Sequence, residues 1–433
     1  MLKSILLWLT AILVLALLAF AIYAYYPEIE PVSSTEYGTF DAQTVEKGRV
    51  LAAAGYCATC HTAQNGAPYA GNYPMETSFG TVYSTNITPD PESGIGAWSE
   101  DAFLRAMTKG VDRQGRHLFP AFPYDHFTRM SNSDISAIYA YLVSEVAPVR
   151  SEQNDNDLPF PLNQRILQAG WKLLFVDFGA YDTEPEQSAA WNRGAYLVEG
   201  ITHCGACHTP RNALGAEKKN ARFDGAAINK WIAPALTAKN ASAIRWSAEE
   251  FSSYLKSGGT AYHGIAAGPM GPVVHAGVRE LPGADLDAIG IYLAAELGAS
   301  ANDASTSEIV SASLAKGKPN KAYRADQGER LYATACASCH YNVAQIARGR
   351  PDLGINSSTR LDEPDNLIHV ILDGVGNEEG IAGVVMPGFR GAFNDDEIAA
   401  IAAYLRSSRT DKESWTGLLD KVAEIRAEPV AMQ

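Results

Sequence analysis

The stretch Cys204–His208 reads Cys-Gly-Ala-Cys-His, and this pattern decides how the chain is organised. The same pattern occurs at Cys57–His61, as Cys-Ala-Thr-Cys-His, and at Cys336–His340, as Cys-Ala-Ser-Cys-His. These three motifs contain all six cysteines of the chain. Their first cysteines are 147 and 132 residues apart (57 to 204 and 204 to 336), which favours one motif in each of three domains.

The C-x-x-C-H pattern is the attachment signature of c-type haem. Two thiols about one helical turn apart reach two vinyl groups on one porphyrin edge, and the following histidine lies beneath the iron. A lone C-x-x-C would also fit a redox pair or half of a zinc site. Three complete motifs with no cysteine left over predict three covalently bound haem c groups. The predicted attachment residues are Cys57, Cys60, Cys204, Cys207, Cys336 and Cys339, and the predicted proximal iron ligands are His61, His208 and His340.

A repeated pair of helical patterns surrounds the motifs. A glycine precedes each first cysteine by 8–10 residues, and a later segment has an acidic residue with Tyr-Leu beginning seven residues further on. The glycines are Gly48, Gly194 and Gly328, and the later segments are 134–142, 285–293 and 397–405. Their apolar residues repeat at helical spacing, and an acid in the first turn suits the helix dipole. Together with the motifs, the two patterns resemble the first and last helices of cytochrome c domains.

The iron of such a domain needs a sixth ligand or an open position. In cytochromes of this type the ligand is usually a methionine in the loop before the last helix. Met270 follows Gly268-Pro269, and Met386 precedes Pro387-Gly388, so both lie in loops rich in glycine and proline. We expect Met270 and Met386 to be the distal ligands of the second and third haem groups.

The first repeat departs from this pattern, because Phe122 stands at the equivalent position and cannot ligate iron. His126 is slightly preferred as the ligand there, and Met130 is the alternative. His117 and Met107 are less favoured. A five-coordinate iron is the third possibility. The alternative role for His126 is that of a hydrogen-bonded loop residue that does not bind the iron.

The N-terminus carries an uncharged run from Ile5 to Tyr26, preceded by Lys3. At a rise of 1.5 Å per residue the run covers about 33 Å, enough to cross a bilayer. It is longer than the apolar core of a cleavable signal, although Ala19–Ala21 is a candidate cleavage site. Lys3 before the run and Glu28 after it predict a cytoplasmic N-terminus. We therefore expect an uncleaved anchor in the inner (cytoplasmic) membrane, with the haem domains in the periplasm.

The predicted fold is mostly α, with three tandem cytochrome c-like haem domains behind an N-terminal transmembrane helix. An apolar run from Trp171 to Phe178 is too short to span and is expected to pack on a domain or partner. A tail stripe with Trp415, Val422 and Ile425 is expected to pack on a membrane, a partner or the third domain. The expected segments are an anchor (1–26), a tether (27–40), domain 1 (41–148), a linker (149–185), domain 2 (186–298), a linker (299–317), domain 3 (318–409) and an amphipathic tail (410–433).

Composition excludes several classes of function. The chain has 433 residues with 35 basic and 49 acidic side chains, a net charge of −14, which argues against nucleic-acid binding. Glycine-rich nucleotide loops, metalloprotease histidine pairs and serine nucleophile elbows are absent from the sequence. No residue set predicts oxidation of an organic substrate by this chain alone, so a catalytic residue is not assigned.

The run Trp191–Gly200 leads into His203–Asn212, and with Ala267–Met270 it resembles the tri-haem cytochrome c subunits of bacterial periplasmic membrane dehydrogenases. The resemblance covers roughly residues 41–409. Members of this family serve quinoprotein alcohol dehydrogenases, flavin-dependent sugar or polyol dehydrogenases, and molybdopterin hydroxylases that act on aldehydes or nicotinate. The segment His117–Thr128 resembles the molybdopterin-associated group, because the quinoprotein group more often has methionine at position 122.

The resemblance implies an electron relay. Electrons would enter from a cofactor of the catalytic subunit, such as an iron–sulfur cluster, and leave to ubiquinone in the membrane. A molybdopterin aldehyde dehydrogenase is the leading candidate for the catalytic partner. Two further hypotheses are a free-standing membrane-tethered shuttle to an oxidase and a peroxidase that uses an open first haem.

Overall fold

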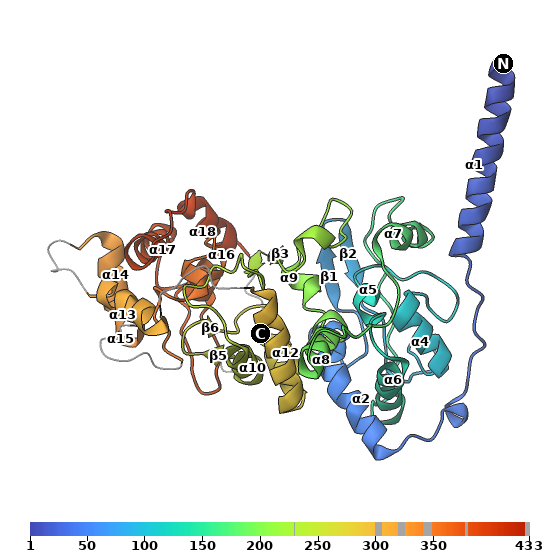
Figure 1. The fold of residues 1–433 in the computed structure, drawn as a ribbon, viewed down its shortest axis with the longest axis horizontal. Coiled ribbons are helices and arrows are strands. Elements are labelled where there is room, and N and C mark those ends of the chain that lie inside the picture. Colours follow the sequence, from blue (N-terminus) through green and yellow to red (C-terminus); the bar gives the residue numbers. More distant parts are fainter. Residues whose placement is uncertain (229, 299–304, 319–324, 341–348, 377–379, 429–433) are drawn as a thin grey trace. The chain divides into compact units, whose positions relative to one another are not determined.

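The computed structural model describes residues 1–228, 230–298, 305–318, 325–340, 349–376 and 380–428. The chain divides into two compact units. Unit 1 consists of Met1–Thr183 and Glu199–His203, and unit 2 of Glu184–Val198 and Cys204–Gln433. Figure 1 shows that helices and irregular loops make up most of both units, as the sequence predicts.

The helices of unit 1 are α1 (Leu2–Ala24), α2 (Ala42–Ala54), α3 (Cys57–Cys60), α4 (Glu100–Lys109), α5 (Tyr124–Phe127), α6 (Asn132–Ser144) and α7 (Leu167–Phe175). The helices that follow along the chain are α8 (Ala189–Glu199), α9 (Gly205–His208), α10 (Ala248–Ser257), α11 (Met270–Pro272), α12 (Gly283–Glu296), α13 (Thr306–Lys316), α14 (Gln327–Ala335), α15 (Ala337–His340), α16 (Asp365–Asp373), α17 (Asp395–Arg409) and α18 (Leu418–Arg426). Three antiparallel hairpins lie between them in the described ranges: β1 (Pro74–Thr77) with β2 (Gly80–Tyr83), β3 (Ala226–Ile228) with β4 (Trp231–Ala233), and β5 (Gly259–Thr260) with β6 (Gly264–Ile265).

One helix crossing occurs three times. The helix before each motif contacts, through its glycine, the helix predicted over 134–142, 285–293 or 397–405, which we call the closing helix. The pairs are α2 with α6, α8 with α12, and α14 with α17. A Cβ atom on the glycine would lie 1.8–2.2 Å from a backbone oxygen of the closing helix, so only glycine permits this approach. The contacts are Gly48 with Ala137, Gly194 with Ala288, and Gly328 with Ala400. The added Cβ atom would also lie close to the tyrosine of the repeated Tyr-Leu pair, namely Tyr141, Tyr292 or Tyr404.

The closing helices form where the sequence predicts them because their starts are capped and their inner faces are apolar. The Ser131 hydroxyl accepts a hydrogen bond from the Asp134 amide at 3.2 Å, and Asn394 forms a capping box with Glu397. The apolar stripe of α6, which includes Ile135 and Ile138, is buried. The third closing helix likewise buries Ile398, Ile401 and Leu405.

Helix α1 projects from the rest of unit 1 (Figure 1). Nearly all of its side chains are exposed. It is the one helix in the described residues that is long and apolar enough to cross a membrane. Side chains of unit 1 bind the chain where α1 ends: the His117 Nε2 donates to the Ala24 carbonyl at 2.9 Å, and Arg105 donates to the Pro27 carbonyl at 2.7 Å. The Ile29 amide donates to the Arg113 carbonyl at 2.9 Å. The segment 27–40, expected to be a tether, is therefore hydrogen-bonded to unit 1 near its start.

Helices α13 and α18 pack on the last part of unit 2. Helix α18 buries Val422 and Ile425 in one apolar core with α16 and α17. The tail stripe thus covers its own chain, which is one of the expected arrangements. Helix α13 lies within the segment expected to be a linker, and its Ser313 hydroxyl donates to the buried Asp352 carboxylate at 2.5 Å. The tail residues 429–433 and the linker residues 299–304 lie outside the described residues.

Candidate haem sites

Each C-x-x-C-H motif forms a single helical turn. In all three motifs the histidine amide donates to the carbonyl of the first cysteine, at 2.9 Å for His61 and His208 and 3.0 Å for His340. Residues three apart on such a turn lie on the same side. The two cysteine side chains of each motif are therefore placed to reach one edge of a common ligand, with the histidine beside them.

The three histidines also share a second contact. Their Nδ1 atoms donate to main-chain carbonyls that follow later in the chain: Thr85 at 2.6 Å for His61, Pro234 at 2.6 Å for His208, and Pro351 at 3.2 Å for His340. A carbonyl can only accept, so the proton must sit on Nδ1. The Nε2 atom then has its lone pair exposed in the neutral ring, which is the form that binds a metal.

Burial favours the same neutral form. Loss of solvent lowers the pKa of His61, His208 and His340, and the carbonyl contact offsets this only in part. Cysteine pairs on one turn and a neutral, oriented imidazole beside them are the donor set that haem c requires. The residues present therefore fit the cofactor that the motifs imply.

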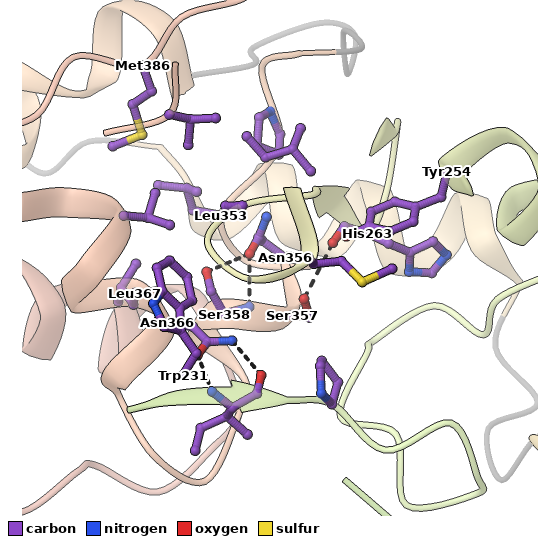
Figure 2. Close-up of a pocket in the computed structure, with 18 of the residues that line it drawn as sticks. Trp231, Tyr254, His263, Leu353, Asn356, Ser357, Ser358, Asn366, Leu367 and Met386 are labelled. Carbon is purple, nitrogen blue, oxygen red and sulfur yellow. Dashed lines mark hydrogen bonds between the residues drawn. The ribbon is translucent and has the colours of Figure 1, made fainter. Parts of the chain in front are cut away.

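In unit 2 the second and third motifs line one cavity of about 550 Å³, a volume within the range of about 300–1,000 Å³ typical of cofactor sites. Its walls are largely apolar, with Trp231 and Leu353 among them (Figure 2). The structure brings together these predicted site residues: Cys207, His208, Met270, Cys336, Cys339, His340 and Met386. Both predicted distal methionines thus face the space that the two histidines border.

A polar clamp lies beside this cavity. The Asn366 side chain, on α16, accepts from the Ile232 amide at 2.7 Å and donates to the Ile232 carbonyl at 2.8 Å (Figure 2). Trp231 stacks on His369 with ring centroids 4.5 Å apart. Strand β4, near the second motif, is therefore fastened to α16, near the third. These residues could not be predicted from sequence, because nothing in their local pattern marks a contact between positions 134 residues apart.

A second cluster surrounds His263 on the cavity wall. The His263 ring is buried, stacks on Trp246 at 3.9 Å, and lies 3.3 Å from the Glu250 carboxylate. The Ser357 hydroxyl donates to the His263 carbonyl at 3.4 Å (Figure 2). These contacts fix the segment that leads to Met270.

The loop that carries Pro351 is held by a fully buried ion pair. Arg409, on α17, donates to the Asp352 carboxylate at 2.8 Å, and both side chains are at most 1% exposed. The same carboxylate accepts from the Ser313 hydroxyl and the Gly354 amide. Because Pro351 accepts from His340, the ion pair positions the third histidine through the loop.

The first site, in unit 1, has Phe122 where the other two sites have methionine. Phe122 is half-buried, 5.3 Å from the Phe127 ring. His126 lies on α5; its Nδ1 donates to the Glu199 carbonyl at 3.0 Å, and its ring is 6.2 Å from that of His203. Met130 is 1% exposed and directly precedes the Ser131 cap.

The two less favoured candidates of the first site have structural partners. His117 is buried and bonded to the end of α1, as described above. Met107 lies in the buried face of α4. His126 and Met130 stay the two predicted distal ligands at this site.

The chain matches the family model "Cytochrome c" over residues 45–145 and the model "Cytochrome C oxidase, cbb3-type, subunit III" over residues 324–405. It is 45% identical to a nicotinate dehydrogenase subunit of Pseudomonas putida over 93% of this chain. That alignment covers only 33% of the relative, so the chain spans a third of that protein's length.

Two shorter relatives are matched over most of both chains. The fructose dehydrogenase cytochrome subunit of Gluconobacter japonicus is 35% identical, over 89% of this chain and 83% of the relative. The cytochrome c subunit of the quinone alcohol dehydrogenase of Gluconobacter oxydans is 34% identical, again over 89% and 83%. Together with the motif geometry, these similarities show that the chain belongs to the family of cytochrome c subunits of bacterial dehydrogenases.

Proposed function

We propose that this chain is the membrane-anchored, tri-haem electron-transfer subunit of a periplasmic dehydrogenase complex. The observation that carries the proposal is that all three C-x-x-C-H motifs share the same turn and the same Nδ1–carbonyl contact. A haem iron, when bound, carries one electron at a time. The chain supplies attachment thiols, an oriented proximal imidazole and an apolar enclosure.

The chain's own residues would perform three tasks. The cysteine pairs would attach each haem covalently, and His61, His208 and His340 would each supply an iron ligand. Met270 and Met386 would supply a further ligand to the second and third irons, because both line the cavity shared by His208 and His340. At the first site His126 or Met130 would take that role. With a haem at each motif, the shared cavity would favour electron passage within unit 2.

The catalytic partner is proposed to be a molybdopterin dehydrogenase of the aldehyde or nicotinate type, with an iron–sulfur cluster as the electron donor. The similarity to a protein named nicotinate dehydrogenase supports this choice over a quinoprotein or flavin partner. The alignment covers a third of that relative, and oxidation of the substrate is assigned to the proposed partner. Ubiquinone is the proposed acceptor.

The uncleaved anchor is part of the proposal. Helix α1 is long and apolar enough to cross a membrane. The buried His117 donates its Nε2–H to the Ala24 carbonyl, which ties the end of this helix to the rest of unit 1. The anchor would hold the haem domains on the periplasmic side of the inner membrane.

Mild detergent extraction and pull-down through this chain, followed by cofactor analysis, tests the proposal. We expect three haem c groups per chain, a large co-purifying subunit, and molybdenum at about one per three haems. Flavin or pyrroloquinoline quinone in place of molybdenum would refute the partner but leave the relay intact. A chain with three haems and no second large subunit would favour the free-standing shuttle.

Ligand spectra test the assignment at the individual sites. Replacing Met270 or Met386 by alanine is expected to remove the absorbance of one methionine-ligated iron and to lower the potential of that haem. His126→Ala and Met130→Ala serve the same purpose at the first site. Carbon monoxide binding to the unmodified chain would instead indicate an open first iron and favour the peroxidase hypothesis.

A further inference from the structure

The segment before and along α7 exposes large apolar side chains. Between residues 160 and 174 six of them are at least 37% exposed, and the exposed fraction reaches 69% at Leu174 and 81% at Phe160. We call this set the α7 face; it consists of Phe160, Leu162, Ile166, Leu167, Leu173 and Leu174. An exposed cluster of this kind marks an interaction surface rather than ordinary protein surface.

The opposite side of α7 carries its charge. Lys172 is 2% exposed, and its Nζ donates to the carbonyls of Lys109 and Gly110, both at 2.7 Å. The ammonium also lies 5.0 Å from the centre of the Tyr124 ring. Helix α7 therefore turns its lysine toward the rest of unit 1 and its leucines outward. A surface helix in water has the opposite arrangement, with its apolar side chains facing the core.

The α7 face lies beside the end of α1. Helix α7 packs against α1, and a Cβ atom on Gly170 would lie 3.6 Å from the Phe20 ring. Tyr23 and Tyr25, at the same end of α1, are 41% and 73% exposed. Tyrosine is typical of the membrane–water interface, so this end of α1 has the chemistry of the level where a bilayer meets water.

We propose that the α7 face inserts into the outer surface of the bilayer that α1 crosses, so that lipid covers it. The inference rests on the proposed anchor, because α1 places the face next to the membrane. Continuity with α1 and the inward-facing lysine favour lipid as the occupant. The net charge of −14 makes hydrophobic insertion, rather than attraction to anionic headgroups, the source of binding.

Lipid photolabelling of the full holo chain tests this inference. The chain would be reconstituted into phosphatidylcholine vesicles that contain a phospholipid with a diazirine on its acyl chain, illuminated and mapped by mass spectrometry. We expect adducts on α1 and also on residues 160–175. The exposed Leu214 of unit 2, 55% exposed, provides an internal comparison and should carry none.

Variants sharpen the test. The double variant Leu173→Gln, Leu174→Gln should lower adduct yield on 160–175 by about tenfold and leave labelling of α1 unchanged. Leu214→Gln is the matched control and should change neither yield. The haem absorbance spectrum of each variant checks folding, and the map of the unmodified chain stands whether or not the variants fold.

The outcomes separate the two proposals. Adducts on α1 alone would overturn the inference and leave the anchor standing. A mature chain that lacks α1 but still labels at 160–175 would overturn the anchor and support insertion. Adducts at 160–175 that disappear when the complete dehydrogenase complex is labelled would show that a protein subunit covers the face, which also overturns insertion.

Discussion

Main-chain atoms, rather than side chains, orient the three motif histidines. Thr85, Pro234 and Pro351 each offer a carbonyl, and any residue type would offer the same acceptor. The attachment cysteines and the histidines could therefore be identified from sequence, because only those residue types perform the chemistry. The residues that orient the histidines could not be identified, because their side chains carry no signal.

The buried Arg409–Asp352 pair gives the first prediction. Arg409→Met would leave the Asp352 carboxylate buried with only its hydrogen bonds from Ser313 and Gly354. Removing one partner of a buried pair costs about 3–5 kcal/mol, so the free energy of unfolding of the region around the third motif should fall by that amount. Denaturant titration followed by haem absorbance measures the change.

An exposed pair serves as the control for this prediction. Arg150 and Glu92 form an ion pair whose side chains are 72% and 62% exposed. Arg150→Met should therefore change stability by less than about 1 kcal/mol. Equal losses of stability in the two variants would show that burial does not make the Arg409–Asp352 pair contribute more than an exposed pair.

Lys172 predicts a dependence of stability on pH. Burial lowers its pKa from 10.5 to about 7. Between those values the unfolded chain binds a proton that the folded chain lacks, so the free energy of unfolding should rise with pH from about 7 to about 10.5. Lys172→Met should flatten this rise in urea titrations across the range. The exposed Lys109→Met is the control, and a rise that persists in Lys172→Met would contradict the assignment.

Among the structural elements, the repeated helix crossing has a strict steric requirement. Gly194→Ala would place a Cβ atom 2.0 Å from the Ala288 carbonyl oxygen, and backbone cannot move aside as a side chain can. Overpacking costs about 1–3 kcal/mol, so we expect a loss of more than about 2 kcal/mol in thermal unfolding. Gly283→Ala, where no atom lies within 4 Å, should be neutral or slightly stabilising.

The elements differ in how well sequence predicts them. The closing helices α6, α12 and α17 were predictable because their apolar stripes extend over three turns or more. The hairpins were not predicted, since strands of two to four residues show no alternation that stands out from a loop. Helix α13 was missed within the linker, although Ser305 and Glu308 form a capping box that is visible in sequence.

For the whole chain, the contacts within unit 2 were the least predictable from sequence. The spacing of the motifs predicts one motif in each domain, and in unit 2 His208 and His340 both line one cavity. The contacts that close this space, such as Asn366 with Ile232, join positions 134 residues apart. Local sequence patterns indicate helical periodicity and helix caps. They carry no signal for contacts between residues so far apart in the chain, so these contacts could not be predicted.

The Asn366 clamp predicts how unit 2 unfolds. Asn366→Ala removes both side-chain bonds to Ile232 and should cost about 1–3 kcal/mol. Amide hydrogen exchange should then show α12 and α17 opening at different free energies, whereas in the unmodified chain they should open together. Joint opening in the variant as well would show that other contacts couple the two regions.

The contacts at the end of α1 have a consequence for the speed of the relay. If the 16 residues from Tyr25 to Phe40 were a flexible chain, their root-mean-square end-to-end distance would be about 20 Å, and unit 1 could move over that distance. Hydrogen bonds at Ala24, Pro27 and Ile29 remove that freedom. If α1 spans the membrane as proposed, these bonds would hold unit 1 at a constant height above the bilayer. An acceptor that diffuses in the plane of the lipid would then meet unit 1 at one unvarying separation, so each encounter would offer the same tunnelling distance.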